Sequence, residues 1–260
     1  MRPGESFENE TVVRNYLDRP DYPLKIYERL AALSRSTTNA LDLGCGTGKV
    51  ARGIAGYFNH VTAVDASAAM LSMAREQSIG TQASNITWVH SLAESAHLDG
   101  PFDLIVAAAS IHWMRHEALF PRLLQTASAD HAFAVVDGDG AYQPPWQQGW
   151  EEFLGRWIPR LSGEAYEPER QDTPFNRHMV RYRDWLEIDG ETTAKHTVSQ
   201  SIERFIRCQH SRDTFAPHKM GAQIELFDQE LDDLLRPFAD EDGCLTYLVR
   251  TRLEWGRIRL

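Results

Sequence analysis

Short apolar runs alternate with helix-compatible segments through the first half of the chain. Strands are predicted at 39–44, 61–65, 85–90, 102–108 and 132–137. Helices are predicted between them at 49–57, from Ser67 onward with that serine as N-cap, and at 115–127. Strands that are apolar at nearly every position are typical of a parallel sheet with helices on both faces. The pattern therefore predicts a doubly wound α/β fold.

The pattern differs on either side of this region. Before it, residues 5–35 predict two short helices interrupted by the prolines of 19–23, because proline does not continue a helix. After it, the sequence predicts a helix from Pro144, a loop at 162–178, one long strand or a strand pair at 185–198, helices at 201–211 and 219–236, and a strand at 245–252. We therefore divide the chain into an N-terminal helical cover (1–38), a core (39–137) and a C-terminal half with a helical cap insertion and the last strands (138–260).

The helix predicted from Pro144 has an aromatic face. Its members are spaced to share one side of the helix, and they are Trp146, Trp150, Phe153 and Trp157. Burial of such large rings contributes strongly to packing. The face has two interpretations, because it either roofs a bound ligand or packs the helix against the sheet.

Composition narrows the function classes. The chain has 260 residues, 42% of them hydrophobic, and a formal net charge of −10, so non-specific nucleic-acid binding, which needs a basic surface, is not expected. Its three cysteines are far apart and imply no disulfide framework, which fits a reducing cytoplasm. No apolar leader is visible at the start, and the most apolar stretch, 102–111, is too short to span a bilayer. We expect a cytoplasmic protein, a monomer or homodimer, that does not associate with membranes.

The turn after the first predicted strand carries the sharpest chemical signal. Gly44, Gly46 and Gly48 alternate there, directly before the predicted helix 49–57. Residues without a Cβ allow a sharp turn and let a ligand lie against the main chain, and the junction is expected to point free backbone N–H groups at that ligand. Asp42 precedes the turn, and its carboxylate suits a cationic ligand group better than a phosphate.

A second carboxylate points to a nucleotide-type ligand. Asp65 ends the second predicted strand, about twenty residues beyond the first glycine, which is the spacing at which an acid binds ribose hydroxyls. Two other glycine motifs do not fit. A dinucleotide motif has its third glycine one residue later, and a P-loop would need glycine in place of Leu43 and serine or threonine in place of Val50.

Together, the run 42–48, Asp65 and the strand segment 102–106 resemble the class I S-adenosylmethionine-dependent methyltransferase family, and within it the type 11 small-molecule branch. Weaker marks at 16–23 and 202–206 are similar to the trans-aconitate-methyltransferase-like group. The resemblance implies a Rossmann-like, mostly parallel, seven-stranded sheet with antiparallel strands at one edge. It also implies S-adenosylmethionine as cofactor and S-adenosylhomocysteine as product.

The resemblance places the cofactor beyond the carboxyl ends of the strands, where ligands bind in open α/β sheets. Asp42 is expected to face the methionine ammonium and Asp65 the ribose, while Leu92 and Ala93 lie along the adenine. Met70 either covers the other face of the adenine or only packs its helix on the sheet. Further cofactor contacts are implied for Gly44, Cys45, Gly46, Gly48, Ala66, Ser91 and Ala107.

The segment after the fourth predicted strand holds our candidate catalytic residue, His112. Imidazole titrates near neutral pH and takes a proton from the acceptor if methylation requires it; alternatively, His112 caps a helix or lines the pocket. Trp113, Tyr16 and Arg19 are the candidates for substrate binding, and Arg19 either meets a substrate carboxylate or forms a structural ion pair. A second histidine follows His112 by four residues, but no acid or cysteine cluster completes a ligand set, so no metal is expected.

The sequence thus predicts methyl transfer from S-adenosylmethionine to a small-molecule acceptor by in-line displacement. Such a reaction requires mainly that the protein aligns the acceptor atom with the methyl carbon and the sulfur. One alternative is an S-adenosylmethionine-binding protein of the same fold with a non-methylating or regulatory role. Another is a nicotinamide dehydrogenase. The acceptor, and the choice between O-, N- and C-methylation, are left open by the sequence.

Overall fold

The computed structural model describes residues 4–163, 165–166 and 179–259. The chain groups into two compact units, and each unit is built from three separate chain segments. Unit 1 comprises Met1–Pro20, Asp139–Asp172 and Lys195–Arg250, and unit 2 comprises Asp21–Gly138, Thr173–Ala194 and Thr251–Leu260. Each unit has its own apolar core, so the two are described separately.

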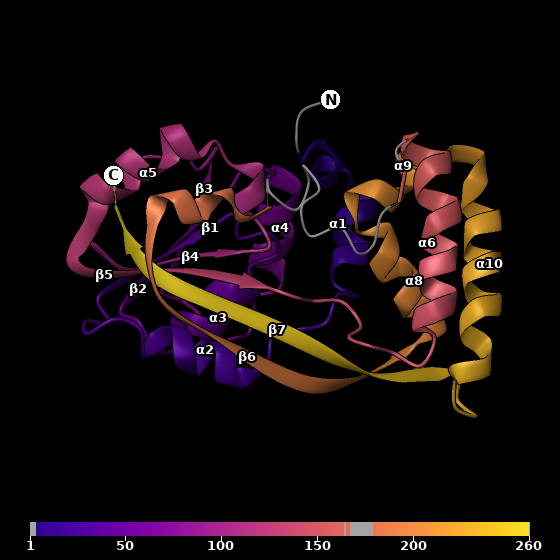
Figure 1. Ribbon diagram of the computed structural model, residues 1–260. Coiled ribbons are helices and arrows are strands. Elements are labelled where there is room, and N and C mark those ends of the chain that lie inside the picture. The colour runs from indigo at the N-terminus through magenta and orange to yellow at the C-terminus, as the bar shows by residue number, and fades with distance from the viewer. Residues whose placement is uncertain (1–3, 164, 167–178, 260) are drawn as a thin grey trace. The chain divides into compact units, whose positions relative to one another are not determined.

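The described residues form a seven-stranded sheet in the order β3-β2-β1-β4-β5-β7-β6 (Figure 1). The strands are β1 Asn39–Leu43, β2 His60–Asp65, β3 Ile86–His90, β4 Phe102–Ala108, β5 Ala127–Asp137, β6 Leu186–Ser201 and β7 Cys244–Ile258. The pairs among β1 to β5 are parallel, whereas β7 pairs with β5 in the antiparallel sense. The predicted Rossmann-like, mostly parallel sheet is therefore confirmed.

Helices cover both faces of the parallel strands in unit 2. They are α2 Leu24–Ala31, α3 Lys49–Ala55, α4 Ala68–Glu76 and α5 His116–Thr126. In Figure 1, α2 and α3 lie below the sheet and α5 lies above it. Leu104 and Val106 of β4 pack with the side chains of α2 and α3, whereas Ile105 and Ala107 pack with those of α5. Because both faces of β4 are buried, its sequence is apolar at nearly every position.

Unit 1 is mainly helical in its described part. Its helices are α1 Glu10–Tyr16, α6 Gln147–Ser162, α8 Ile202–His210, α9 Pro217–Met220 and α10 Ile224–Leu235. The aromatic face of α6 packs in one apolar cluster with side chains of α8, α10 and β7, and Trp146 and Trp157 are almost fully buried there. The packing interpretation of that face therefore holds. The helix begins at Gln147 rather than at Pro144.

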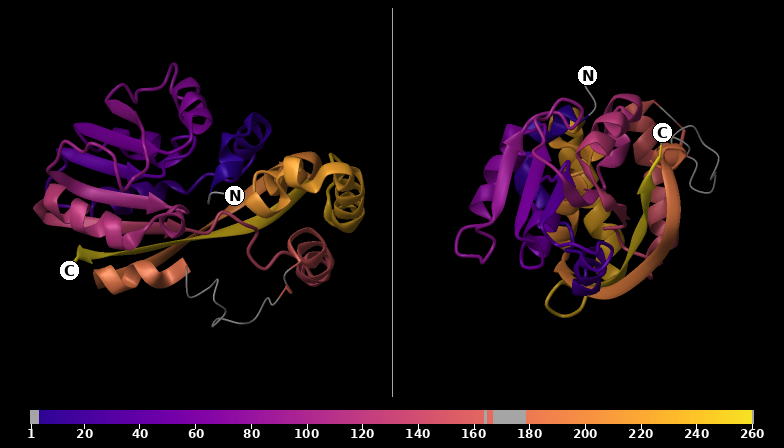
Figure 2. Two further views of the ribbon diagram at one scale, coloured as in Figure 1. Left: turned by 90° about the horizontal axis from the view of Figure 1, so that it is seen from above. Right: turned by 90° about the vertical axis from the view of Figure 1, so that its left-hand side faces the viewer.

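Several predicted boundaries are wrong. β5 begins at Ala127 rather than at 132, and β7 ends at Ile258 rather than at 252. The helix predicted at 219–236 is interrupted at Gly221, whose φ of 56° and ψ of −129° are not helical. For the prediction at 185–198, the single long strand holds, since β6 runs unbroken beside β7 (Figure 2). The predicted loop at 162–178 lies largely outside the described residues.

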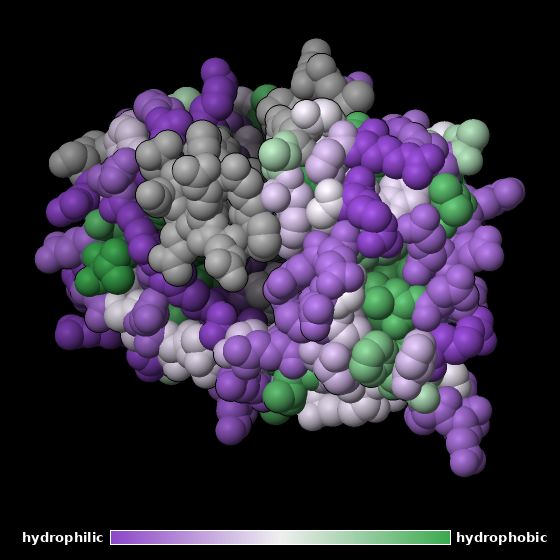
Figure 3. Space-filling view, turned by 45° about the vertical axis from the view of Figure 1, so that its right-hand side comes forward, coloured by the Kyte–Doolittle hydropathy of each residue, from purple (hydrophilic) through white to green (hydrophobic). Residues whose placement is uncertain are grey.

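The surface is mostly polar where it can be seen. In Figure 3, hydrophilic side chains cover most of the drawn face, and hydrophobic residues form small separate areas. Across the described ranges, no helix combines the length and the hydropathy that crossing a membrane requires.

Candidate functional site

The turn after β1 has a backbone that only glycine adopts readily. Gly44, Gly46 and Gly48 have φ angles of 63°, 53° and 78°, which L side chains rarely adopt. A Cβ on Gly44 would lie 2.6 Å from Cβ of Ser110, and one on Gly48 would lie 2.5 Å from a ring carbon of Trp88. The glycine turn, residues 44–48, therefore needs glycine for both conformation and space.

The N–H groups of the glycine turn bind within the protein, so the prediction that they are free to face a ligand is wrong at three positions. The N–H of Cys45 donates to the carbonyl of Val64 at 3.0 Å, and that of Gly48 donates to the carbonyl of Cys45 at 2.8 Å. The N–H of Gly46 donates to Oδ2 of Asp65 at 2.8 Å. A phosphate would need such donors, so their internal use argues against a phosphate at these positions.

Asp42 lies in β1, just before the glycine turn, and only 1% of its surface is exposed. Its Oδ2 accepts the N–H of Ala51 in α3 at 3.0 Å, whereas its buried Oδ1 has no hydrogen-bond partner among the described residues. Burial raises the pKa of Asp42 to about 7; the hydrogen bond from Ala51 opposes this rise and the carboxylate of Asp65 adds to it. A buried polar atom without a partner is costly, so a cationic ligand group would relieve Asp42.

Asp65 connects the glycine turn to the start of α4. One carboxylate oxygen accepts the N–H of Gly46, and the other accepts the N–H of Ser67 at 2.8 Å. Ser67 is the N-cap of α4, as predicted, and its Oγ accepts the N–H of Met70 at 3.0 Å. These bonds fix Asp65 at the carboxyl end of β2, beside the turn. Its contact with a ribose stays a prediction.

The other residues predicted for the cofactor differ in burial. Ser91, after β3, donates its N–H to the carbonyl of Asp65 at 3.0 Å, so this loop begins beside the second carboxylate. Ser91 is half-buried, and the exposed members are Ala66 and Leu92. The buried members are Cys45, Met70, Ala93 and Ala107. Their contacts with the cofactor stay predictions.

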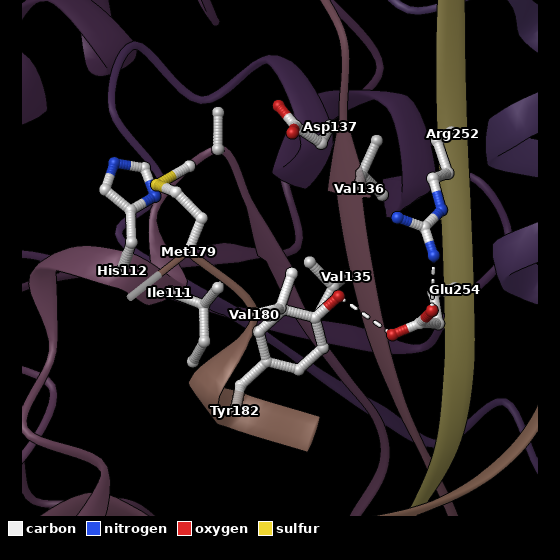
Figure 4. Close-up of a pocket in the computed structure, with 11 residues that line it drawn as sticks. Ile111, His112, Val135, Val136, Asp137, Met179, Val180, Tyr182, Arg252 and Glu254 are labelled. Atoms are coloured by element: carbon white, nitrogen blue, oxygen red, sulfur yellow. Dashed lines mark hydrogen bonds and ion pairs between the residues drawn. The ribbon is translucent and has the colours of Figure 1, made fainter. Parts of the chain in front are cut away.

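The segment after β4 leads from the glycine turn to a pocket in unit 2. Oγ of Ser110 donates to the carbonyl of Leu43 at 2.6 Å, which ties this segment to the end of β1. Ala109 beside it has a left-handed φ of 50°. The space within the outline of the pocket, open solvent included, is about 450 Å³. Its lining (Figure 4) consists of Ala109, Ile111, His112, Val135, Val136, Asp137, Met179, Val180, Tyr182, Arg252 and Glu254.

Strand β7 brings two charged residues to this pocket that the sequence analysis did not single out. The antiparallel register sets Arg252 opposite Asp137 and Glu254 opposite Val135. Neither residue belongs to a local motif. The one available signal was the alternation of buried and polar positions that continues past 252, and the predicted strand was ended there.

Glu254 is the centre of a hydrogen-bonded cluster beside the pocket. Its Oε1 accepts from Oη of Tyr182 at 2.8 Å and from Nε of Arg183 at 2.9 Å, and its Oε2 accepts from Nη2 of Arg252 at 2.6 Å. Burial alone would raise the pKa of Glu254, but the hydrogen bonds from Arg183 and Tyr182 outweigh burial and lower it. The cluster joins the 3-10 helix η3 (Arg181–Trp185) to β7.

Two of the predicted substrate residues, Tyr16 and Arg19, lie in unit 1. Arg19 donates from Nε to Oγ of Ser211 at 2.7 Å and from Nη2 to the Ser211 carbonyl at 2.8 Å, and it pairs with Asp139 at 3.2 Å. Its guanidinium also lies 4.2 Å from the ring centre of Tyr16. The side chain of Arg19 is only 9% exposed. This geometry supports a structural ion pair, and substrate binding by either residue stays a prediction.

The third predicted substrate residue, Trp113, belongs to unit 2. It lies in the 3-10 helix η2 (Ile111–Trp113), it is 38% exposed, and its ring centre is 4.8 Å from that of His112. His116, by contrast, is buried, and its Nε2 is 2.9 Å from the carbonyl of Ile111. In the part of the chain that the structure describes, no group of three or more His, Cys, Asp or Glu side chains is arranged to hold a metal.

The sequence of the chain is similar to those of known methyltransferases. Residues 40–129 match the model of a methyltransferase domain. The chain is 29% identical over 153 residues to "Probable S-adenosylmethionine-dependent methyltransferase CRG1" of Saccharomyces cerevisiae, a match covering 54% of this chain and 53% of that protein. It is 32% identical over 143 residues to trans-aconitate 2-methyltransferase of Paracidovorax citrulli, covering 52% of each. The chain thus spans about half the length of the curated relatives it matches.

The fold has a counterpart among solved structures. A candidate type II methyltransferase of Anaeromyxobacter dehalogenans is 19% identical, with a TM-score of 0.70 over 92% of this chain and 97% of that one. At this identity the likeness shows the fold alone. The family match, however, covers residues 40–129, which include the glycine turn and the two carboxylates. The chain therefore carries a methyltransferase domain that is similar to those of S-adenosylmethionine-dependent methyltransferases.

Proposed function

We propose that the protein transfers a methyl group from S-adenosylmethionine to a small-molecule acceptor. The observation that carries this proposal is the buried, unpartnered Oδ1 of Asp42 at the glycine turn, because the cofactor's methionine end bears the ammonium that such an oxygen needs. The relative named for trans-aconitate, itself a small molecule, supports the acceptor class.

The residues of unit 2 fit this cofactor. Asp42 would receive the ammonium beside the glycine turn, whose bend depends on glycines with left-handed φ angles. The oxygens of Asp65 accept the N–H groups of Gly46 and Ser67, and the ribose hydroxyls would donate to the same carboxylate, since a carboxylate oxygen can accept more than one hydrogen bond. Leu92 and Ala93 would lie along the adenine.

The protein's own part in the reaction is to align the acceptor and to receive a proton where one is released. When bound, S-adenosylmethionine supplies a methyl carbon that leaves sulfur, with the bonding electrons kept by sulfur, as the acceptor's electron pair forms the new bond. Alignment of this kind can contribute roughly 7–11 kcal/mol. A ring nitrogen of His112 would take the proton of an oxygen or nitrogen acceptor, and with other acceptors His112 would serve as a wall of the pocket.

Two measurements test the proposed function. Titration calorimetry with S-adenosylhomocysteine should show binding to ligand-stripped protein, and methyl-labelled S-adenosylmethionine should transfer its label into a small-molecule extract. Absence of binding heat would refute the cofactor assignment. Binding without any label transfer would refute methyl transfer to a small molecule and leave a binding role.

A matched pair of histidine variants tests the proposed base. His112→Ala should lower kcat by about 10²- to 10⁴-fold, with S-adenosylhomocysteine affinity unchanged. His97→Ala is the control, because its side chain is 91% exposed and its ion pair with Asp99 lies on the surface. A normal kcat for His112→Ala would leave His112 as a wall residue.

A further inference from the structure

We propose that the pocket beside η2 binds the methyl acceptor and selects a neutral, mostly apolar molecule that carries an oxygen-bearing end. This inference rests on the proposed function and adds to it the acceptor's binding site and its chemical class.

The place of the pocket relative to the glycine turn supports an acceptor site. Ser110 contacts the turn directly, because its Oγ binds the carbonyl of Leu43 and a Cβ on Gly44 would collide with it. Ala109 and Ile111, the neighbours of Ser110, both line the pocket. The same short segment, 109–111, thus contacts the glycine turn and lines the pocket.

Most of the pocket wall is apolar. Six of the lining residues have aliphatic or thioether side chains, and these are Ala109, Ile111, Val135, Val136, Met179 and Val180. Val135 and Ile111 also belong to the apolar core that covers this face of the sheet. An acceptor with an apolar body would gain roughly 25 cal/mol for each Å² of apolar surface that it buries here.

The charges that the structure describes at the pocket leave no excess of positive charge. Arg252 is paired with Glu191 at 2.8 Å and with Glu254 at 2.6 Å, and the guanidinium of Arg183 also binds Glu254. The two arginines are therefore matched by two glutamates. Asp137, which also lines the pocket, is a further acidic residue. A free carboxylate on the acceptor would meet no uncompensated cation among these groups, and desolvation of that carboxylate would oppose binding.

Arg252 nevertheless offers a hydrogen-bond donor to a neutral oxygen. Its Nε and Nη2 bind the two glutamates, whereas its Nη1 has no partner among the described residues. In Figure 4, one terminal nitrogen of Arg252 points to Glu254 and the other points away from it, on the side of Val136. A carbonyl, ether or hydroxyl oxygen of the acceptor can accept from Nη1 without bringing a charge into the pocket.

The test compares neutral probes with their acids. A panel of small hydroxylated aromatic compounds is offered in pairs, each as the methyl ester and as the free acid, for example methyl 4-hydroxybenzoate and 4-hydroxybenzoate. Dissociation constants are measured by ligand-observed NMR on full-length protein in the presence of S-adenosylhomocysteine. We expect the esters to bind with Kd values at least about tenfold lower than those of the acids.

Two bulky substitutions locate the binding. Val180→Trp should fill the pocket and raise the Kd of the esters by at least about tenfold. Leu124→Trp is the matched control, because Leu124 has nearly the same exposure (37% against 38%) but does not line the pocket. Arg252→Lys keeps the positive charge and removes the second terminal nitrogen. It should therefore raise the Kd of the esters, while the protein still binds the esters more tightly than the acids.

The outcomes separate this inference from the proposed function. Tighter binding of the acids, equal Kd values in wild type and Val180→Trp, or no binding by any member of the panel would overturn the acceptor class or the pocket. Calorimetry with S-adenosylhomocysteine on the same preparations reports the cofactor site alone. Absence of binding heat in that titration would refute the proposed function. Normal binding of S-adenosylhomocysteine without the expected binding of the esters would refute only the assignment of the pocket.

Discussion

At the residue scale, the buried charge of Asp42 lowers the stability of the folded protein, and the same charge would bind a cationic ligand. Its pKa is raised from 3.8 to about 7 by burial, so between these values the folded state binds more protons than the unfolded state. The free energy of unfolding therefore falls as pH rises from about 4 to about 7, and it stays low above that, by roughly 4 kcal/mol. A cationic ligand beside Asp42 would offset this cost.

Asp42→Asn tests this conflict. At about pH 8, the variant should raise the free energy of unfolding of the ligand-free protein by about 1–2 kcal/mol, because it removes a buried charge. It should raise the Kd of S-adenosylhomocysteine by about tenfold or more, because it removes a charged hydrogen-bond acceptor. Urea unfolding and calorimetry measure the two effects, with Asp130→Asn, at a side chain 57% exposed, as the control. Unchanged cofactor affinity would remove Asp42 from the ammonium site.

Gly44 and Gly56 form a second matched pair at this scale. Gly44→Ala should lower the free energy of unfolding by about 1–3 kcal/mol, since φ is 63° and the new Cβ would lie 2.6 Å from Cβ of Ser110. Gly56 has φ of −71°, and no atom lies within 4 Å of the position that a Cβ would take there, so Gly56→Ala should be neutral or stabilise by about 0.4–1 kcal/mol. Equal effects of the two changes in urea unfolding would contradict the strain argument.

At the element scale, Glu254 determines how η3 is held against β7. Glu254→Gln leaves Arg183 and Arg252 without their shared carboxylate and should lower the free energy of unfolding at about pH 7 by about 2–3 kcal/mol. Glu191→Gln is the control, because Glu191 is 62% exposed and exposed pairs contribute about 0–1 kcal/mol.

The same variant has a pH signature. Because the pKa of Glu254 lies below its ordinary 4.5, the carboxylate stabilises the folded state above that value and this stability is lost as pH falls through the folded pKa. Urea unfolding of wild type and Glu254→Gln should therefore converge in acid. A gap that stays constant down to about pH 3 would show that the cost arises from packing rather than from charge.

The elements that the sequence predicted well are those with a local cause. β1 to β4 were predicted because each contains a short run rich in apolar residues, and Ser67 carries its own capping oxygen. β7 was ended too early, at 252, although its alternation of buried and polar positions continues toward Ile258. Its true length depends on pairing with β5, which no local pattern encodes.

The candidate site likewise has one part that the local sequence predicts and another that depends on pairing between distant segments. The glycine turn and the two carboxylates lie within about twenty residues of one another, so their spacing alone indicated a nucleotide-type ligand. The pocket beside η2 is built from four segments, and Arg252 and Glu254 reach it only through the antiparallel pairing of β5 and β7. The internal use of the turn's N–H groups was not predictable either, because it depends on where the carboxylate of Asp65 points.

At the scale of the whole molecule, unit 1 is assembled from three chain segments that are far apart in the sequence. Arg19 joins all three, because it comes from the first and binds Asp139 of the second and Ser211 of the third. Asp18 next to it adds ion pairs to Arg204 and Arg207 at 2.7 Å each. The N-terminal segment is thereby attached to residues nearly two hundred positions away in the sequence. Loss of Arg19 should therefore lower the stability of the unit.

Arg19→Met should therefore lower the free energy of unfolding by about 1–3 kcal/mol, a cost limited by Arg212, which still pairs with Asp139 at 3.2 Å. Arg14→Met is the control, since the side chain of Arg14 is 75% exposed and its ion pair with Glu10 is long, at 3.9 Å. Urea unfolding gives the stability, and the KM of an acceptor gives any role in binding. Unchanged stability with a raised KM would assign Arg19 to the acceptor, because a guanidinium that served only as an ion pair could not be removed from a 9% exposed position without a cost in folding.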